Sequence, residues 1–158
     1  ATRSLPVADV VSTRILLETQ SSLDAASSET GERDRVLAEA EQMLDRMEDP
    51  EVGDEEFHAL DAQFHLHLAS LGGNVVLETI MASLREATIG YVQETVAATS
   101  DWPGIRERLQ EQHRAIHRAT RARDGERAAR LLREHIMWFY GHAPDAARAT
   151  EQPAGHGR

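Results

Sequence analysis

The sequence contains no cysteine, which excludes disulfide bonds and thiolate metal ligands. It contains no lysine either, so all 17 basic residues are arginine, and the 27 acidic residues leave a formal net charge of −10. We expect a surface this acidic to repel phosphate groups and to lack a basic stripe. The chain by itself is therefore predicted not to bind nucleic acid.

Long apolar runs are missing as well. No stretch approaches the roughly 18 apolar residues that a membrane span needs. The N-terminal residues lack the charged start and the apolar core of a signal peptide. We expect a cytoplasmic protein without a membrane partner. Its 158 residues, of which 41% are hydrophobic, suffice for one globular domain with a sizeable core.

Proline and glycine are few, and alternating β-branched residues are nearly absent. Apolar residues recur instead at the three- and four-residue spacing that is typical of helices. Capping residues, glycines and prolines divide the chain into about six helices, at roughly 7–26, 32–47, 54–71, 75–98, 102–122 and 125–140. Six helices with short connections predict an all-α fold, an antiparallel bundle.

The third of these predicted helices holds the most informative segment. At about 100° per residue, its apolar side chains form one stripe: Phe57, Leu60, Phe64, Leu68 and Leu71. Asp61 falls inside the stripe and His65 falls at its margin. A carboxylate that faces a core is costly unless another group satisfies it. Because Asp61 and His65 are four residues apart, they point from the same side of the helix and can hold one ion.

The last two predicted helices form a hairpin around Asp124. His113 and His135 lie on the inner faces of these helices, and each is 11 residues from Asp124. In an antiparallel hairpin this places the two rings at one height, about 16 Å from the turn. One aspartate and three histidines that converge in a bundle core indicate a site for a divalent first-row metal. Zinc is the preferred ion, and nickel, cobalt, manganese and iron are alternatives.

The inward histidines and Asp61 can also have purely structural roles, which is the alternative to the metal hypothesis. A single inward histidine is more often a hydrogen-bonded core residue than a ligand, and Asp61 alone can pair with an arginine. The joint occurrence of four such residues favours the metal. His58, His67 and His117 point away from the apolar stripes and are expected on the surface. His142 lies near the end of the last helix and is a reserve ligand.

Two arginines are candidates for a ligand pocket. Arg14 and Glu18, four residues apart on the first predicted helix, form either an ion pair that stabilises the helix or part of a pocket. Arg85, in the middle of the predicted fourth helix, is open to the same two interpretations. The residues alone do not decide between them.

Taken in order, the motifs resemble the FCD domain, the C-terminal effector domain of the FadR branch of GntR transcription regulators. The matching residues are Arg14 and Glu18, Asp61-x-x-Phe64-His65, Gly73-Asn74-x-x-Leu77, His113-x-x-Ile116, Asp124 and His135. Two residues depart from the family pattern. Arg123 stands where a glycine is usual, and Val75 stands where a proline is common. The match covers about residues 8–142.

The resemblance implies a metal-binding effector domain. It assigns the metal to four ligands: Asp61, His65, His113 and His135. It implies a small carboxylate or a sugar acid as the effector, and a homodimer as the assembly. Candidate effector-binding residues are Arg14, Asn74 and Arg85.

The resemblance also implies a domain organisation. Family members have an upstream winged helix-turn-helix domain that this sequence does not contain, so DNA contact is expected only through that missing part. We expect residues 1–7 to be the end of an interdomain linker. Residues 8–142 are expected to form the helical ligand-binding domain, and residues 143–158 a flexible tail.

Three functions compete at this point. The preferred one is a sensor, in which metal and effector favour one domain arrangement and so change the DNA affinity of the whole protein. The alternative is a metal-dependent, hydrolase-like helical-bundle enzyme, because a metal with three histidines and one carboxylate can activate water. No further acid or base beside the ion can be identified from the sequence, which favours the sensor. The third is a helical interaction module whose polar core residues are merely structural.

Overall fold

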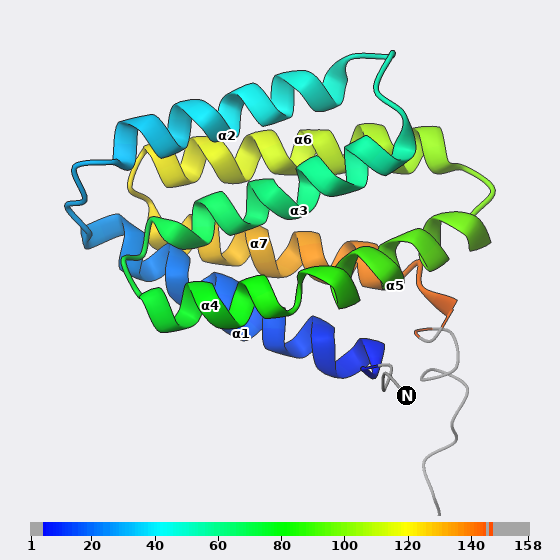
Figure 1. Ribbon diagram of the computed structural model, residues 1–158, viewed down its shortest axis with the longest axis horizontal. Helices are drawn as coiled ribbons and strands as arrows, with labels where there is room; N and C mark the ends of the chain where they lie inside the picture. Colours follow the sequence, from blue (N-terminus) through cyan, green and yellow to red (C-terminus); the bar gives the residue numbers. More distant parts are fainter. Residues whose placement is uncertain (1–4, 145, 147–158) are drawn as a thin grey trace, which may run out of the picture.

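The computed structural model describes residues 5–144 and 146, and within them it contains seven α-helices and no strand. They are α1 (Val7–Ser27), α2 (Arg33–Glu48), α3 (Asp54–Ser70), α4 (Val75–Ser83), α5 (Arg85–Ala98), α6 (Trp102–Arg121) and α7 (Gly125–Tyr140). The helices lie roughly along one axis as a bundle (Figure 1). The predicted all-α fold is therefore confirmed.

Helix α3 is the central element of this bundle. It packs against α1, α2, α4 and α5, while α7 packs against α1 and α6. Fully buried side chains fill the space between the helices, among them Leu44, Met47, Phe57, Phe64, Leu71, Ile116 and Ile136. A helix surrounded on several sides buries more than one face. Polar residues of α3 such as His58 and His65 are buried for this reason.

Side-chain caps fix where three helices begin. The Oδ1 atoms of Asn74, Asp101 and Asp124 accept hydrogen bonds from backbone amides three residues further on, at 3.1, 3.2 and 3.1 Å. The turn before α7 contains Arg123 with a φ of 58°, in the left-handed region that favours glycine. The cap at Asp124 and this turn set the geometry of the α6–α7 hairpin, as the sequence predicts.

The predicted fourth helix, 75–98, is two helices rather than one. The Ser83 hydroxyl donates to the Ile80 carbonyl at 2.6 Å, and this is the acceptor that the Leu84 amide would use in an unbroken α-helix. The Leu84 amide instead donates to Met81 at 3.1 Å. The regular pattern resumes when Thr88 donates to Leu84. The expectation of about six helices was therefore one helix short, because the run is interrupted at Leu84 without a glycine or a proline.

The expected linker and tail lie mostly beyond what the structure describes. Residues 1–4 of the predicted linker, and residues 145 and 147–158 of the predicted tail, are outside the described residues. Within the described part, no helix combines the length and the apolar character that crossing a membrane requires.

Candidate metal centre

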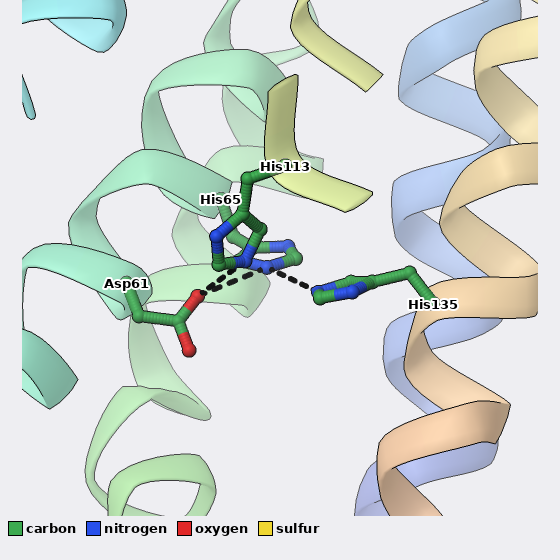
Figure 2. Close-up of side chains that lie close together, drawn as sticks. All are labelled: Asp61, His65, His113 and His135. Atoms are coloured by element: carbon green, nitrogen blue, oxygen red, sulfur yellow. Dashed lines mark hydrogen bonds and ion pairs between the residues drawn. The ribbon is translucent and has the colours of Figure 1, made fainter. Parts of the chain in front are cut away.

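Three helices bring the predicted ligands together in the middle of the bundle. Asp61 and His65 come from α3, His113 from α6 and His135 from α7, and their side chains point toward one another (Figure 2). The three histidines are buried, and the Asp61 side chain is 15% exposed. The structure therefore places the four residues as the helix pattern predicted.

The distances within this cluster are those of atoms that surround a single ion. The Oδ1 atom of Asp61 lies 3.3 Å from Nε2 of His65 and 3.0 Å from Nε2 of His113. The Nε2 atoms of His65 and His135 are 3.2 Å apart. One ligand atom from each residue lies within 4.8 Å of all the others. For comparison, two ligands about 2.1 Å from a tetrahedral zinc ion lie about 3.4 Å apart.

The outer nitrogen of His113 shows which way its ring is protonated. Its Nδ1 lies 3.0 Å from Oε1 of Gln110. The amide nitrogen of Gln110 donates to the Leu44 carbonyl at 3.1 Å, which fixes the orientation of the amide group. Since Oε1 of Gln110 can only accept, Nδ1 of His113 carries the proton. Nε2 of His113 then presents a lone pair to the centre.

The other two rings are held in the same way. Nδ1 of His135 lies 2.7 Å from Oε1 of Gln112. Nδ1 of His65 donates to Oε1 of Glu18, which is buried on α1. An oxygen on the outer nitrogen of each ring is the usual support of a histidine that ligates a metal.

This arrangement leaves polar atoms unsatisfied at the centre. Oδ1 of Asp61 and Nε2 of His113 are two of the buried side-chain atoms without a hydrogen-bond partner among the described residues. Such atoms are rare in folded proteins and call for an ion, a water or a functional role. A cation at the centre would satisfy both atoms.

Charge is distributed unequally over the cluster. Burial alone lowers the pKa of His65, but Glu18 and then Asp61 outweigh it and raise this pKa to about 9. Burial lowers the pKa of His113, and burial together with the His113 and His65 rings holds the pKa of His135 well below its ordinary value. His113 and His135 are therefore neutral near pH 7, as metal ligands must be. The proton on His65 has to leave when an ion binds.

The Arg14–Glu18 pair lies directly behind this cluster. Nε of Arg14 is 3.0 Å from Oε2 of Glu18, and both side chains are buried. The other oxygen of Glu18 holds His65. The two interpretations left open for Arg14 are thus compatible, because the ion pair also stands at the wall of the site.

A cavity of about 20 Å³ lies beside the cluster. Its polar lining comes from Arg14, His58, Asp61, His65, Thr88, Tyr91 and His135. Apolar side chains of α5, α6 and α7 complete the wall. This volume is enough for about one water molecule. In the conformation described here the cavity has no room for a carboxylic acid.

The three predicted effector residues occupy different surroundings. Arg14 lines the cavity. Arg85 lines an adjoining hollow together with Arg14, His65 and Thr88, and it pairs with Glu86 at 2.8 Å. Asn74 is exposed and lines neither space, and its side chain caps α4.

Three histidines lie elsewhere than expected or have unexpected partners. His58 and His117 were expected on the surface, but they are only 4% and 5% exposed. His58 is buried because α3 is covered on several sides. His117 is buried because α2 packs against α6, and its Nε2 donates to the Leu37 carbonyl of α2 at 2.9 Å. His67 is partly buried and pairs with Glu39 at 2.9 Å. His142, the reserve ligand, is exposed.

Sequence reasoning missed the residues that orient the ligands. Gln110 gave no signal of its own, since glutamine is common on helix surfaces, and the spacing of Gln112 with Ile105, Leu109 and Ile116 showed only that it lies on the inner face of its helix. Glu18 did give one, because it falls on the same face of α1 as Val11 and Ile15, and a carboxylate on an apolar face needs a partner. That face shows that Glu18 is buried but not what it binds.

Comparison with known families agrees with the resemblance. The sequence matches the FCD domain over residues 9–137. The chain belongs to the FCD domain family. Domains of this family are the regulatory, non-enzymatic effector-binding domains of GntR-type transcription regulators. The prediction of a regulatory, effector-binding domain is confirmed.

A solved structure has the same fold. The chain superposes on Streptococcus agalactiae GntR with a TM-score of 0.63 at 24% sequence identity. The match covers 82% of this chain but only 55% of that protein, so the chain spans about half of its length. No curated protein matches the sequence.

Proposed function

We propose that this FCD domain senses a small carboxylate or sugar acid through a divalent metal ion held by Asp61, His65, His113 and His135. The observation that supports this most strongly is the common orientation of the three rings. Each outer nitrogen donates to an oxygen, so three Nε2 atoms and one carboxylate oxygen face a common centre. Oδ1 of Asp61 and Nε2 of His113 have no hydrogen-bond partner of standard geometry among the described residues, and a cation between them would satisfy both.

Zinc is the ion we propose first. Imidazole and carboxylate ligands suit zinc, and they also suit nickel, cobalt, manganese and iron. The ion would supply a positive centre that attracts a carboxylate oxygen of the effector. Four protein ligands leave one or two positions for such an oxygen when the ion is five- or six-coordinate.

Arg14 is the residue we propose for the other end of the effector. It is a buried cation in the wall of the cavity, and its planar guanidinium suits a second carboxylate. His58 is a further candidate, because its Nδ1 is buried without a partner and the residue lines the same cavity. Arg85 is a weaker candidate, since it lines only the adjoining hollow. For Asn74 we propose a capping role.

Effector binding requires the cavity to enlarge. Helix α5 supplies Thr88, Tyr91 and Val92 to the wall, and it is separated from α4 by the irregular turn at Leu84. We propose that α5 moves when the acid binds, with Leu84 as the hinge. Hydrogen exchange of α5 amides should then slow when the effector is added, while the amides of α6 change little.

Metal analysis tests the first part of the proposal. Protein purified without nickel resin should contain close to one divalent ion per chain, measured by elemental analysis. After chelation, calorimetric titration with zinc should restore the same stoichiometry. Less than about a tenth of an equivalent, with no uptake of added zinc, would show that the centre does not bind metal and that its polar residues are structural.

Thermal-shift screening with carboxylates and sugar acids tests the second part. A bound effector raises the melting temperature in proportion to the logarithm of its concentration. The shift should vanish after chelation and should fall in the Arg14→Gln variant, and it should fall less in Arg85→Gln, because Arg85 lines only the adjoining hollow. Metal content is measured for both variants, because Arg14 also contacts Glu18. Shifts that survive chelation would place the acid elsewhere.

The remaining parts of the proposal concern the whole regulator. We propose that residues 8–142 form the sensor domain, that it acts as a homodimer, and that DNA is contacted through a separate winged helix-turn-helix domain. Sedimentation analysis measures the oligomeric state. Specific binding of DNA by the 158-residue chain alone, seen as a gel shift at physiological salt, would contradict the proposal that a separate domain contacts DNA.

A further inference from the structure

A second polar cluster lies at the turn of the α6–α7 hairpin, away from the candidate ligands. Residues 114–133 contain seven of the chain's 17 arginines and only two acidic residues. The expectation that the arginines form no basic cluster, drawn from the net charge of −10, is therefore wrong for this segment. In Figure 1 the turn between α6 and α7 lies beside the connection between α1 and α2. Arginines from both connections meet there.

Arg33, at the start of α2, is the buried member of this cluster. It is only 7% exposed. Its Nη1 donates to the Ala25 carbonyl at 3.0 Å, and its Nη2 donates to the Thr120 carbonyl at 2.6 Å. Neutral carbonyls fix the position of the guanidinium but do not cancel its charge. Burial, and after it the positive charge of Arg123, lower the pKa of Arg33.

Arg121 and Arg123 line the same hollow as Arg33. Arg123 donates to the carbonyls of Ala26 and Ser28 at 3.3 and 3.1 Å. It does so from a left-handed backbone conformation that costs a non-glycine residue about 1–2 kcal/mol. The three arginines thus bring like charges to one hollow, although the chain has an excess of carboxylates.

No described carboxylate forms an ion pair with any of these three arginines. Other arginines on the same two helices do pair: Arg35 with Glu39 at 2.7 Å, and Arg114 with Asp45 at 2.7 Å. Ion pairing is therefore the rule along α2 and α6, and it stops at the turn. An anion from solution could therefore bind to these three arginines in place of a carboxylate.

The cluster also surrounds enough space for a ligand. A hollow of about 460 Å³ is lined by Arg33, Asp34, Leu37, Ala38, Glu41, His117, Arg121 and Arg123. This volume is in the range of small-molecule sites. Nε2 of His117 donates to Leu37, so its Nδ1 is an acceptor when the ring is neutral. The two carboxylates would repel a long phosphate backbone but leave room for a compact ion.

We propose that this hollow binds a small, multiply charged oxyanion, a phosphate or a polycarboxylate, through Arg33, Arg121 and Arg123. Guanidinium groups bind such ions with paired hydrogen bonds. The proposal does not depend on the metal centre, which is formed by other residues. The regulator would then have a second ligand site at the turn of the hairpin, separate from the candidate metal centre in its middle.

Titration of the metal-loaded chain with inorganic phosphate tests this inference. Backbone amide shifts are followed by NMR up to about 50 mM phosphate, with chloride replaced so that ionic strength stays constant. We expect saturating shifts around Arg33 and residues 121–124. Arg121→Gln and Arg123→Asn should each weaken phosphate binding about tenfold, as expected for the loss of one charged donor. Asparagine tolerates the left-handed conformation, so the second variant keeps the turn.

Two control variants test where the phosphate binds. Arg130→Gln removes an exposed arginine of α7 that does not line the hollow and should leave phosphate affinity unchanged. His135→Ala shows whether phosphate binds at the metal instead. Absence of saturating shifts in the unmodified chain overturns the proposal. So does binding that survives both turn variants, or binding that is lost only in His135→Ala. Pyrophosphate and citrate, titrated in the same way, distinguish phosphates from polycarboxylates.

Discussion

The middle and the turn of the α6–α7 hairpin differ in how their polar groups are satisfied. In the middle, His113 and His135 each have an oxygen on the outer nitrogen and a free lone pair facing inward. At the turn, Arg121 and Arg123 line a hollow, and no carboxylate of the described residues forms an ion pair with them. The hairpin thus has imidazole nitrogens at one height and guanidinium groups at another, so the two proposed sites would bind ions of opposite charge.

The difference follows from burial and from the length of the side chains. Imidazole rings in the middle are short and enclosed on all sides, so burial keeps two of them neutral. The guanidinium groups at the turn keep their charge, because the pKa of arginine is too high for burial to remove it. Net charge alone therefore says little about which ion a given part of this chain attracts.

Replacing a ligand in the middle should have the largest effect. We expect His135→Ala to weaken zinc binding by more than about 100-fold, because loss of a direct ligand exceeds the 10–100-fold loss typical of supporting residues. His117→Ala is the matched control on α6. It removes a buried ring that donates to Leu37, so it should lower stability but leave zinc affinity unchanged. Equal losses of affinity in a calorimetric titration would contradict the assigned ligands.

Replacing a supporting group should have a smaller effect on the same property. Glu18→Gln keeps the shape of the side chain but removes the charge that binds Nδ1 of His65. We expect zinc affinity to fall about 10–100-fold. Glu39→Gln is the control, since Glu39 makes the same kind of contact with His67, which is not a proposed ligand. Unchanged affinity in Glu18→Gln would mean that α1 does not support the metal centre.

Removing the cap at the turn should separate stability from metal binding. Asp124→Ala deletes the acceptor for the Arg127 amide at the start of α7, which should cost about 1 kcal/mol of unfolding free energy. His113 and His135 lie about three turns of helix from this cap and are oriented by Gln110 and Gln112, so zinc affinity should stay the same. Denaturant unfolding of the metal-free protein and calorimetry measure the two quantities. A parallel loss of affinity would show that the turn positions the ligands.

The smallest effect is expected for an arginine at the turn. In chloride buffer, Arg121→Gln should change the unfolding free energy by less than about 0.5 kcal/mol, because an exposed residue without an ion pair contributes little to stability. A destabilisation above about 1 kcal/mol, measured by the same denaturant unfolding, would show that Arg121 is structural. The contrast between the two parts of the hairpin would then disappear.

Much of this site could be predicted because helices are regular. The i,i+4 spacing of Asp61 and His65, and the equal distances of His113 and His135 from Asp124, fix which faces and heights these residues occupy. Local periodicity also predicted the all-α fold. It failed at Leu84, where the helix is interrupted although the sequence has no glycine or proline there.

The sequence by itself determined most of the helices, the four residues that meet in the middle of the bundle and the family, because each depends on spacing along one chain. Only the tertiary structure decided which groups stand behind the ligands and which charges meet without partners. Glu18 approaches His65 from 47 residues away, and Arg33 meets Thr120 from 87 residues away. Contacts of that kind depend on how the helices pack, and helical periodicity contains no information about the identity of the neighbouring helix.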